Sequence, residues 1–286
     1  MTRSKARSRR QAPRIDRLSL APLTNFDIGA FFAILIALAA WRAKVLTGTG
    51  ALAAVIIGTL VYGSGGWPNA AVLFAFFISS VILSRIGRAR KKNLVDAGKL
   101  GARDGEQVLA NGLVAAVCAM FALGGNPLWQ IGFVAAFATA TSDTWATETG
   151  TLVRVAPRSI LTGKPMPVGL SGGVTSAGTA AALLGALFVA LIALSVHASG
   201  AVLAVTIGGF TGCLVDSVLG ATVQALRYCA GCKRYCETDP HVCGADTTLM
   251  RGANWMNNDA VNFLATVFGA ATAIGVVYFF PYFFSR

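Results

Sequence analysis

Long apolar runs follow one another along most of this chain and limit what it can fold into. A helix needs about 20 mostly apolar residues to cross the hydrocarbon core of a bilayer. Hydrophobic residues make up 55% of the 286 residues and charged residues 13%, about half of the charged share of an ordinary soluble domain. We therefore predict an all-α fold, a polytopic transmembrane helical bundle of seven or eight spans. The candidate spans are residues 26–41, 50–63, 69–84, 108–124, 127–146, 173–197, 200–226 and 260–284.

The segment at 50–63 is the shortest of these, and it fits either a tilted span or a re-entrant piece buried in protein. Residues 1–25 form a basic segment that we predict to be a disordered tail, with the transmembrane domain at 26–286. The net charge is +12, but the cations lie between apolar runs, so the expected partner is the lipid bilayer and not nucleic acid. Small-residue stripes serve packing within and between chains alike, so they define no oligomeric state.

Three basic polar stretches, 85–106, 154–168 and 227–259, alternate with pairs of spans. They therefore share one side of the membrane, and the positive-inside rule makes that side cytoplasmic. We expect the membrane to be the cell (inner) membrane. The basic tail would also prefer the cytoplasm, yet three candidate spans precede Arg85 and put the tail on the other side. The sequence leaves the side of the amino terminus open.

Asp216 is the sharpest candidate for a functional carboxylate. An ionisable side chain inside a span costs about 2.5 to 3.5 kcal/mol on insertion, so each one is a functional hypothesis. Gly209, Gly212 and Gly220 fall within about 40° of Asp216 on a helical wheel, so a neighbouring helix can approach there. This carboxylate can hold magnesium or a cation in transit, or it can be a buried partner of an arginine.

Asp143 and Glu148 lie in a hydroxyl-rich helix end. On a regular helix they are about 140° apart, so they converge on one ion only if the helix ends or unwinds between them. The alternative is a solvated helix end.

Amide side chains begin two further spans. Asn258 and Asn262 are one turn apart and share a helix face, as Gln107 and Asn111 do. One of residues 257–259 is expected to be an N-cap, and the remaining polar side chains there exceed what capping requires.

The segment 157–178 combines Arg158 and Lys164 with Gly172 and Gly173 before a helix. Glycine amides at a helix N-terminus beside cations are suited to phosphate. A flexible loop whose cations only obey topology is the alternative.

Four of the six cysteines gather in one loop. Cys229, Cys232, Cys236 and Cys243 lie near His241, with a C-x2-C spacing typical of structural zinc sites. Free reduced thiols and disulfides stay open as alternatives, the latter disfavoured in a reducing compartment. Cys118 and Cys213 lie in spans and are expected in the core.

Six segments together resemble one known family, the membrane proteins of domain of unknown function 92, also called the transmembrane-protein-19 family. They are LTGTGALAAVIIGTLVYGSGGW (46–67), DGEQVLANG (104–112), ATSDTWATETG (140–150), GLSGGVTSAGT (169–179), DSVLGATVQ (216–224) and NNDAVN (257–262). The family includes the phytyl-phosphate kinase of plants and cyanobacteria. The resemblance implies a kinase that moves a phosphoryl group from CTP or another nucleoside triphosphate to phytyl or a related prenyl monophosphate.

Under this resemblance the candidate site residues take roles. Asp143, Glu148, Asp216 and Asp259 would hold Mg²⁺, which prefers carboxylates plus phosphate oxygens. Phosphates would be held by Arg158, Lys164, Gly172 and Gly173, and the nucleotide or substrate would be oriented by Gln107, Asn111, Gln224, Asn258 and Asn262.

Two other classes of protein remain open at this point. An ion-coupled transporter would use Asp143 and Asp216 as proton or sodium sites. A non-catalytic scaffold would use the cysteine loop for docking, which leaves Asp216 without a role. The depth of the carboxylates in the membrane distinguishes a transporter from a kinase, because transport sites lie near the bilayer midplane.

Overall fold

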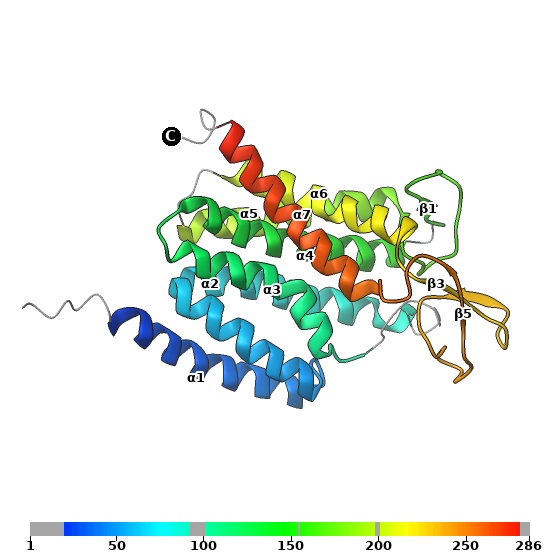
Figure 1. The fold of residues 1–286 in the computed structure, drawn as a ribbon, viewed down its shortest axis with the longest axis horizontal. Coiled ribbons are helices and arrows are strands. Elements are labelled where there is room, and N and C mark those ends of the chain that lie inside the picture. Colours follow the sequence, from blue (N-terminus) through cyan, green and yellow to red (C-terminus); the bar gives the residue numbers. More distant parts are fainter. Residues whose placement is uncertain (1–19, 92–100, 154, 198–200, 281–286) are drawn as a thin grey trace, which may run out of the picture.

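The protein, seen in a computed structural model, is a bundle of long helices whose polar loops gather at one end (Figure 1). The structure describes residues 20–91, 101–153, 155–197 and 201–280. Its helices are α1 (Leu20–Arg42), α2 (Gly48–Lys91), α3 (Gly105–Ala122), α4 (Pro127–Leu152), α5 (Ser176–His197), α6 (Val202–Thr222) and α7 (Asn258–Phe279). All of these except α4 are long and apolar enough to cross a membrane. The predicted transmembrane helical bundle is confirmed.

The first helix begins earlier than the sequence indicates. α1 starts at Leu20, inside the segment that we assigned to the tail. Residues 1–19, the rest of that predicted tail, lie outside the described residues. The beginning of α1 lies at the end of the bundle opposite the polar loops (Figure 1).

α2 is a helical hairpin and not one straight rod. Gly66 interrupts it with φ 61° and ψ −145°, and Pro68 follows. Arg103 lies against Gly50 at the start of the first arm and against Phe76 in the second. A straight helix would hold those two residues roughly 39 Å apart at about 1.5 Å per residue. The arms therefore run side by side in opposite directions, and they are the predicted spans 50–63 and 69–84 (Figure 1).

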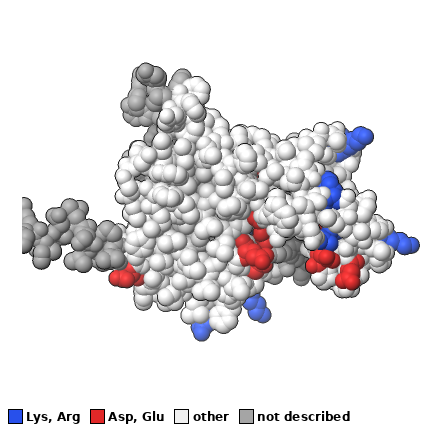
Figure 2. All heavy atoms as spheres, in the orientation of Figure 1, with Lys and Arg blue, Asp and Glu red and all other residues white. Residues whose placement is uncertain are grey.

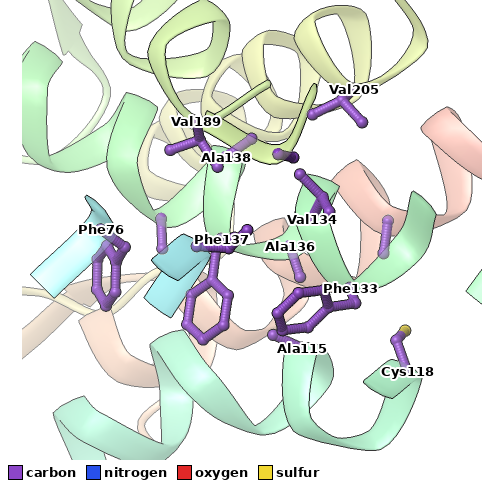
Figure 3. Close-up of a cluster of buried hydrophobic side chains, with 14 of the residues drawn as sticks. Phe76, Ala115, Cys118, Phe133, Val134, Ala136, Phe137, Ala138, Val189 and Val205 are labelled. Carbon is purple, nitrogen blue, oxygen red and sulfur yellow. The ribbon is translucent and has the colours of Figure 1, made fainter. Parts of the chain in front are cut away.

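α4 is the central helix of the bundle. It packs against α2, α3, α5, α6 and α7, so its surface faces protein and tolerates the hydroxyls and carboxylates that lower its hydropathy. Figure 3 shows the core around it, where Phe137 stacks on Phe76 and meets Phe133 edge to face, each with 5.5 Å between ring centres. Cys118 is buried in this core as predicted.

Glycines let α6 approach its neighbours closely. A Cβ added to Gly208 would lie 2.5 Å from the carbonyl oxygen of Gly269 in α7. A Cβ added to Gly212 would lie 2.5 Å from the Thr139 side chain in α4. The close helix approach that the glycine pattern around Asp216 predicts is confirmed.

Short strands hold the loops at the polar end, and an all-α pattern does not include them. β1 (Arg158–Ser159) pairs with β2 (Gly173–Val174), and the cysteine-rich loop forms an antiparallel sheet of β4 (Arg234–Cys236), β3 (Leu226–Cys229) and β5 (Thr248–Arg251), in the order β4-β3-β5. In Figure 2 the visible body of the bundle is nearly free of charge, and most charged side chains lie toward the loop-bearing end. This distribution is typical of a protein whose helices face lipid.

Candidate functional site

A polar cavity of about 320 Å³ opens where α4, α6 and the loops meet. Carboxylates from three elements line it: Asp143 of α4, Asp216 of α6 and Asp259 of α7. A fourth, Glu237, comes from the cysteine-rich loop. The structure therefore brings together side chains that are more than a hundred positions apart in the sequence.

A second cavity of about 500 Å³, the side cavity, adjoins the polar cavity. The two share the residues Gln107, Asp143, Thr147 and Asn258. The side cavity adds Asn111, Glu148 and Asn262 to the wall, together with Arg103. Both one-turn pairs, Gln107 with Asn111 and Asn258 with Asn262, thus face one cavity, as their spacing predicts.

An apolar groove of about 110 Å³ leads away from these cavities between α1, α2 and α3. Its walls are side chains such as Phe32, Ile36 and Phe77. Arg103 and Asn111 line both the groove and the side cavity, and Gln107 lines all three spaces. The groove and the polar spaces are therefore contiguous at the first turn of α3.

Asp143 and Asp216 form the acidic centre of the polar cavity. Oδ2 of Asp216 is buried and has no hydrogen-bond partner among the described residues. Asp143 and Glu237 both lie close enough to act on it electrostatically. A carboxylate with a buried, unbonded oxygen and two other carboxylates nearby is stabilised by a cation, so these residues fit a metal ion that also binds phosphate oxygens.

Glu148 is held on a different face of α4. The helix continues without a break to Leu152, so Asp143 and Glu148 do not converge by unwinding. Glu148 is buried and accepts a 2.8 Å hydrogen bond from Ser84 Oγ. Burial lowers the pKa of Arg103, and the nearby Glu148 carboxylate opposes that shift. Glu148 therefore lines the side cavity, where the Arg103 guanidinium is a nearby positive charge.

Asp259 has a second set of neighbours. Its carboxylate lies within 4.8 Å of those of Asp104 and Glu106. Among the described residues, these are the three carboxylates whose oxygen atoms all lie that close together. The predicted N-cap of α7 is Asn257, whose Oδ1 accepts from the Ala260 N–H, so Asp259 and Asn258 are not needed for capping. Gln107 itself closes a capping box with Asp104 at the start of α3.

The glycine loop contributes backbone, and its cations lie elsewhere. Gly172 and Gly173 line the polar cavity just before α5, and Gly172 adopts φ 85°, a conformation that favours glycine. Arg158 and Lys164 are exposed and are not part of the cavity wall; Arg158 donates to the Gly163 carbonyl. Of the four residues predicted to hold phosphate, the two glycines line the cavity and the two cations do not.

Glu237 is one of the site residues that the sequence reasoning missed, as are Arg103, Asp104 and Glu106. It accepts hydrogen bonds from the Ser171 N–H (2.6 Å), the Ser171 hydroxyl (2.9 Å) and Gln224 Nε2 (2.9 Å). Burial raises the pKa of Glu237, and these bonds together with Arg251 oppose the shift. Gln224 is buried behind the cavity wall and orients Glu237, instead of lining the cavity as a nucleotide ligand would. Hydropathy alone cannot find Glu237, because it lies in a polar loop.

Four side chains of the cysteine-rich loop lie close together. Cys229, Cys232, His241 and Cys243 have their sulfur and nitrogen atoms within 4.8 Å of one another. Cys236, which we had included, is buried outside this group with its Sγ near the Thr238 carbonyl. The cysteines are free thiols in the structure. Hydrogen bonds from His241 and from the Ala245 backbone lower the pKa of Cys243 to about 6.

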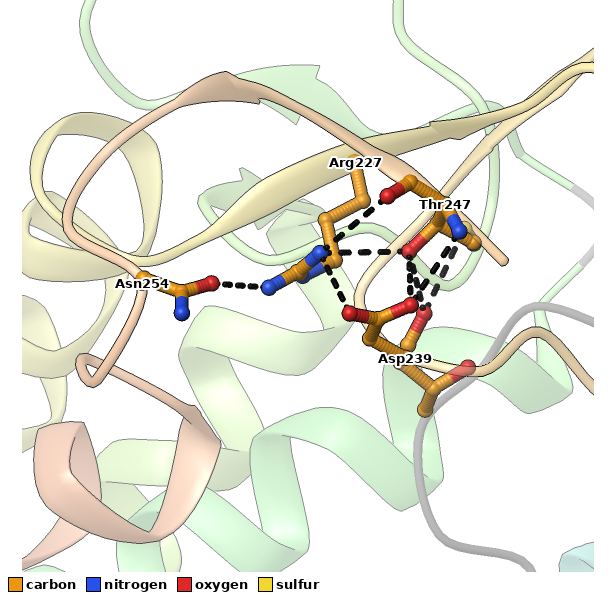
Figure 4. Close-up of polar contacts among 6 residues, drawn as sticks. Arg227, Asp239, Thr247 and Asn254 are labelled. Atoms are coloured by element: carbon orange, nitrogen blue, oxygen red, sulfur yellow. Dashed lines mark hydrogen bonds and ion pairs between the residues drawn. The ribbon is translucent and has the colours of Figure 1, made fainter.

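A buried arginine fastens the cysteine-rich loop to the start of α7. Arg227 of β3 pairs with Asp239 at 2.9 Å and hydrogen-bonds Thr247 and Asn254 (Figure 4). Asp239 in turn accepts from the Thr247 N–H and hydroxyl. Those bonds lower the pKa of Asp239. The network fixes the sheet against the end of the helical bundle.

Comparison with known proteins places the chain in a family. Residues 31–270 match the family described as Integral membrane protein DUF92. The chain is 31% identical over 240 residues to an uncharacterized membrane protein of Synechocystis, covering 82% of this chain and 83% of that protein. It is 28% identical over 296 residues to Protein PGR of Arabidopsis thaliana, covering 92% and 100% of the two chains.

A further Arabidopsis relative is Protein VTE6, chloroplastic, which is 25% identical over 236 residues, 80% of this chain and 64% of the relative. No solved structure matches the chain at a significant level.

Proposed function

This chain belongs to the DUF92 family of integral membrane proteins, and from that premise we propose that it is a membrane-embedded prenyl-phosphate kinase. It transfers a phosphoryl group from CTP or another nucleoside triphosphate to phytyl or a related prenyl monophosphate and releases the prenyl diphosphate. The choice of reaction and of CTP follows from the family resemblance. The match to a VTE6 protein is consistent with it.

The observation that carries the proposal is the junction of the apolar groove with the acidic cavities at Gln107. A prenyl phosphate has a charged head and a long apolar tail. Its head would lie near Arg103 and Asn111, which line both the groove and the side cavity. Its tail would lie along the groove between α1, α2 and α3. Burial of each CH₂ group contributes about 0.8 kcal/mol, so the groove is an appropriate anchor for such a tail.

Three helix N-termini support phosphate binding at the same place. The first turns of α3 and α7 contribute Gln107 and Asn258 to the polar cavity wall, and Thr175, which directly precedes α5, contributes as well. Free N–H groups and the helix dipole favour anions at these ends. Gly172 and Gly173 let backbone approach the phosphates, and Arg103 supplies a cation at the groove mouth.

Magnesium fits the acidic wall, since Oδ2 of Asp216 is buried without a hydrogen-bond partner among the described residues. Mg²⁺ is bound through one or two carboxylates plus substrate phosphates. Asp143 and Asp216 would hold it in the polar cavity, Glu148 faces the side cavity, and Asp259 would act with Asp104 and Glu106. When bound, the ion neutralises charge on the phosphate oxygens.

The reaction itself needs positioning more than covalent help from the protein. An oxygen of the prenyl monophosphate attacks the γ-phosphorus while the bond to the β–γ bridging oxygen breaks, and the nucleoside diphosphate leaves. Arg103, Gln107 and Asn111 would hold the acceptor at the groove mouth, and the glycine loop would hold the donor. The charges developing in transfer lie among helix N-termini that are already oriented.

The position of the cavities favours a kinase over a transporter. The polar cavity is walled partly by loop residues such as Ser171 and Thr238, at the end of the bundle that carries the polar loops (Figure 1). A transport site would instead lie near the midplane. We place the polar loops in the cytoplasm, where nucleotides are available, because their cations obey the positive-inside rule.

The test is transfer of labelled γ-phosphate from CTP, ATP and GTP to phytyl, geranylgeranyl, farnesyl and geranyl monophosphates. The protein is purified in lipid nanodiscs and assayed with Mg²⁺. We expect a labelled prenyl diphosphate from at least one pair. If the folded protein binds prenyl phosphates yet gives no product from any pair, the kinase proposal is wrong, and ion-flux measurements on Asp143 and Asp216 variants become the next experiment.

A groove variant tests the binding mode of the tail separately. Ile36→Trp places a bulky ring in the groove wall, whereas Ile34→Trp adds the same ring on α1 at an exposed residue outside the groove. We expect Ile36→Trp to raise KM for phytyl phosphate about tenfold or more and to affect geranyl phosphate little, while Ile34→Trp resembles wild type. Equal effects of both variants on every chain length would refute the groove assignment.

A further inference from the structure

We propose that Cys229, Cys232, His241 and Cys243 bind one structural Zn²⁺ ion, and that this ion holds the loop carrying Glu237 against the polar cavity. The four ligand atoms lie within 4.8 Å of one another. They come from two short segments, Cys229–Cys232 and His241–Cys243, which are separated in sequence by the β4 strand and by Glu237. The site is independent of the kinase reaction, and its test does not require that reaction.

The distances agree with tetrahedral zinc. Zinc–sulfur bonds of about 2.3 Å and zinc–nitrogen bonds of about 2.0 to 2.1 Å put two sulfurs about 3.8 Å apart, and a sulfur and a nitrogen about 3.6 Å apart, around one ion. Cys229 Sγ and Cys243 Sγ are 3.7 Å apart. Cys232 Sγ is 3.5 Å from His241 Nδ1, and Cys243 Sγ is 3.0 Å from it. Of these three distances, only the last needs to lengthen.

The same distances disfavour a disulfide. A disulfide requires sulfurs about 2.05 Å apart, whereas Cys229 Sγ and Cys243 Sγ are 3.7 Å apart. A disulfide would also link only two of the three sulfurs, and it would not include the buried His241 ring. All four side chains are used at once when they surround a metal ion.

The backbone turns after each ligand pair in the same way. Lys233, which directly follows Cys232, adopts φ 54°, and Gly244, which directly follows Cys243, adopts φ 84°. A non-glycine residue with positive φ is uncommon and marks a local constraint. The two segments are thus two matching turns that direct their side chains to one point.

The ion would be structural and not catalytic. Four protein ligands close a tetrahedral site, whereas catalytic zinc keeps a position open for water or substrate. The surrounding sheet also needs such support, since every residue of β5 is exposed and β4 has one buried residue, Cys236. Small units without enough core are often stabilised by a metal ion.

The zinc cluster determines where Glu237 lies. Glu237 is four residues before His241 and five after Cys232, so both flanks of its segment lead to a ligand. Its carboxylate accepts hydrogen bonds from Ser171 on the cavity wall and from Gln224 behind that wall. Asp239, in the same segment, pairs with Arg227 (Figure 4). Loss of the metal ion would therefore release Glu237 from the cavity.

The experiment measures metal content of the full-length protein, purified in detergent without chelator, by mass spectrometry of the elements. We expect about one zinc ion per chain. Cys232→Ser and His241→Ala should lower this at least about tenfold. His241→Cys, which keeps four ligands, should retain zinc. Cys236→Ser and Cys118→Ser are matched controls that replace cysteines outside the cluster and should retain it as well.

Two further measurements keep the proposal testable if a variant fails to fold. Wild-type protein stripped of zinc and loaded with Co²⁺ should show the thiolate charge-transfer and visible absorption bands of a tetrahedral cobalt site. Amide hydrogen exchange over residues 226–251 should become faster when zinc is removed, while exchange in the helices is unchanged. Glu237→Gln should keep full zinc content.

The proposal is overturned if wild-type protein contains no zinc and binds none after reduction and addition of Zn²⁺. It is equally overturned if Cys236→Ser lowers zinc content as much as Cys232→Ser does. A zinc-loaded protein whose loop exchanges equally fast with and without the metal ion would refute the positioning of Glu237. Failure of phosphoryl transfer alters none of these results, so the two proposals fail separately.

Discussion

Asp216→Asn should separate the function of the acidic centre from its cost to stability. The substitution keeps the shape of the side chain and removes its charge. Oδ2 of Asp216 is buried without a hydrogen-bond partner among the described residues, and Asp143 and Glu237 add like charges nearby. The wild-type carboxylate therefore opposes folding unless a cation is bound.

The expected magnitudes follow from that placement. A carboxylate inside a span costs about 2.5 to 3.5 kcal/mol, so Asp216→Asn should be more stable than wild type by up to about 3 kcal/mol without Mg²⁺. At about 2 to 4 °C per kcal/mol, Tm should rise by several degrees. Phosphoryl transfer should fall about 100- to 1,000-fold, the usual loss when one charge-stabilising group is removed.

The assays are thermal unfolding with and without Mg²⁺, and transfer from labelled nucleotide. Saturating Mg²⁺ should raise the Tm of wild type, because a ligand at about 100 times its Kd stabilises by about 2.7 kcal/mol. The same Mg²⁺ should raise the Tm of Asp216→Asn much less. Asp27→Asn, an exposed aspartate near the start of α1, is the matched control and should resemble wild type.

Two results would refute the reasoning. The first is a variant that is less stable than wild type without Mg²⁺, which would mean that the Asp216 carboxylate stabilises the fold and is not held ready for a cation. The second is a variant with wild-type phosphoryl transfer, which would remove Asp216 from the site.

Two further predictions concern packing and pH. Gly208→Leu should lower the free energy of unfolding by about 3 kcal/mol or more, because a Cβ there would meet the Gly269 backbone. Gly275→Leu is the control, because Gly275 faces open space and should tolerate the larger side chain. Thermal unfolding compares the two variants, and equal Tm values would contradict the close approach of α6 and α7. Since burial raises the pKa of Glu237, its ionisation opposes folding, and the stability that its neutral form contributes is lost as pH rises through the raised pKa. Glu237→Gln should therefore gain Tm relative to wild type as pH is raised from about 4 to 7 without Mg²⁺, and a difference that stays constant over this range would contradict the shift.

The spacing of the cysteines predicted only part of the arrangement of the cysteine-rich loop. The C-x2-C pattern indicated a metal site, but it gave no reason to separate Cys236 from the other cysteines. In the sheet Cys229 lies opposite Arg234, next to the turn that carries Cys232, whereas Cys236 lies opposite Arg227, two residues further from that turn along β3. Strand register made that choice, because a residue's position along a pair of strands decides which neighbours its side chain meets.

The sequence alone determined the helices, their approximate ends and the common side of the polar loops. These features depend on local properties: the length of apolar runs, the one-turn spacing of Asn258 and Asn262, and capping residues such as Asn257. Hydropathy and hydrogen bonding of neighbouring residues are sufficient to specify them, since each helix satisfies its own backbone.

Only the tertiary structure decided which polar groups share a site. It placed Arg103 and Gln107 at the mouth of an apolar groove, and it brought Glu237 and Asp216 to one cavity while Arg158 and Lys164 stayed outside. These relations depend on how helices and loops far apart in the chain pack together. Packing follows from shape and from close approaches such as that of Gly208 to Gly269, which no local pattern of residues specifies.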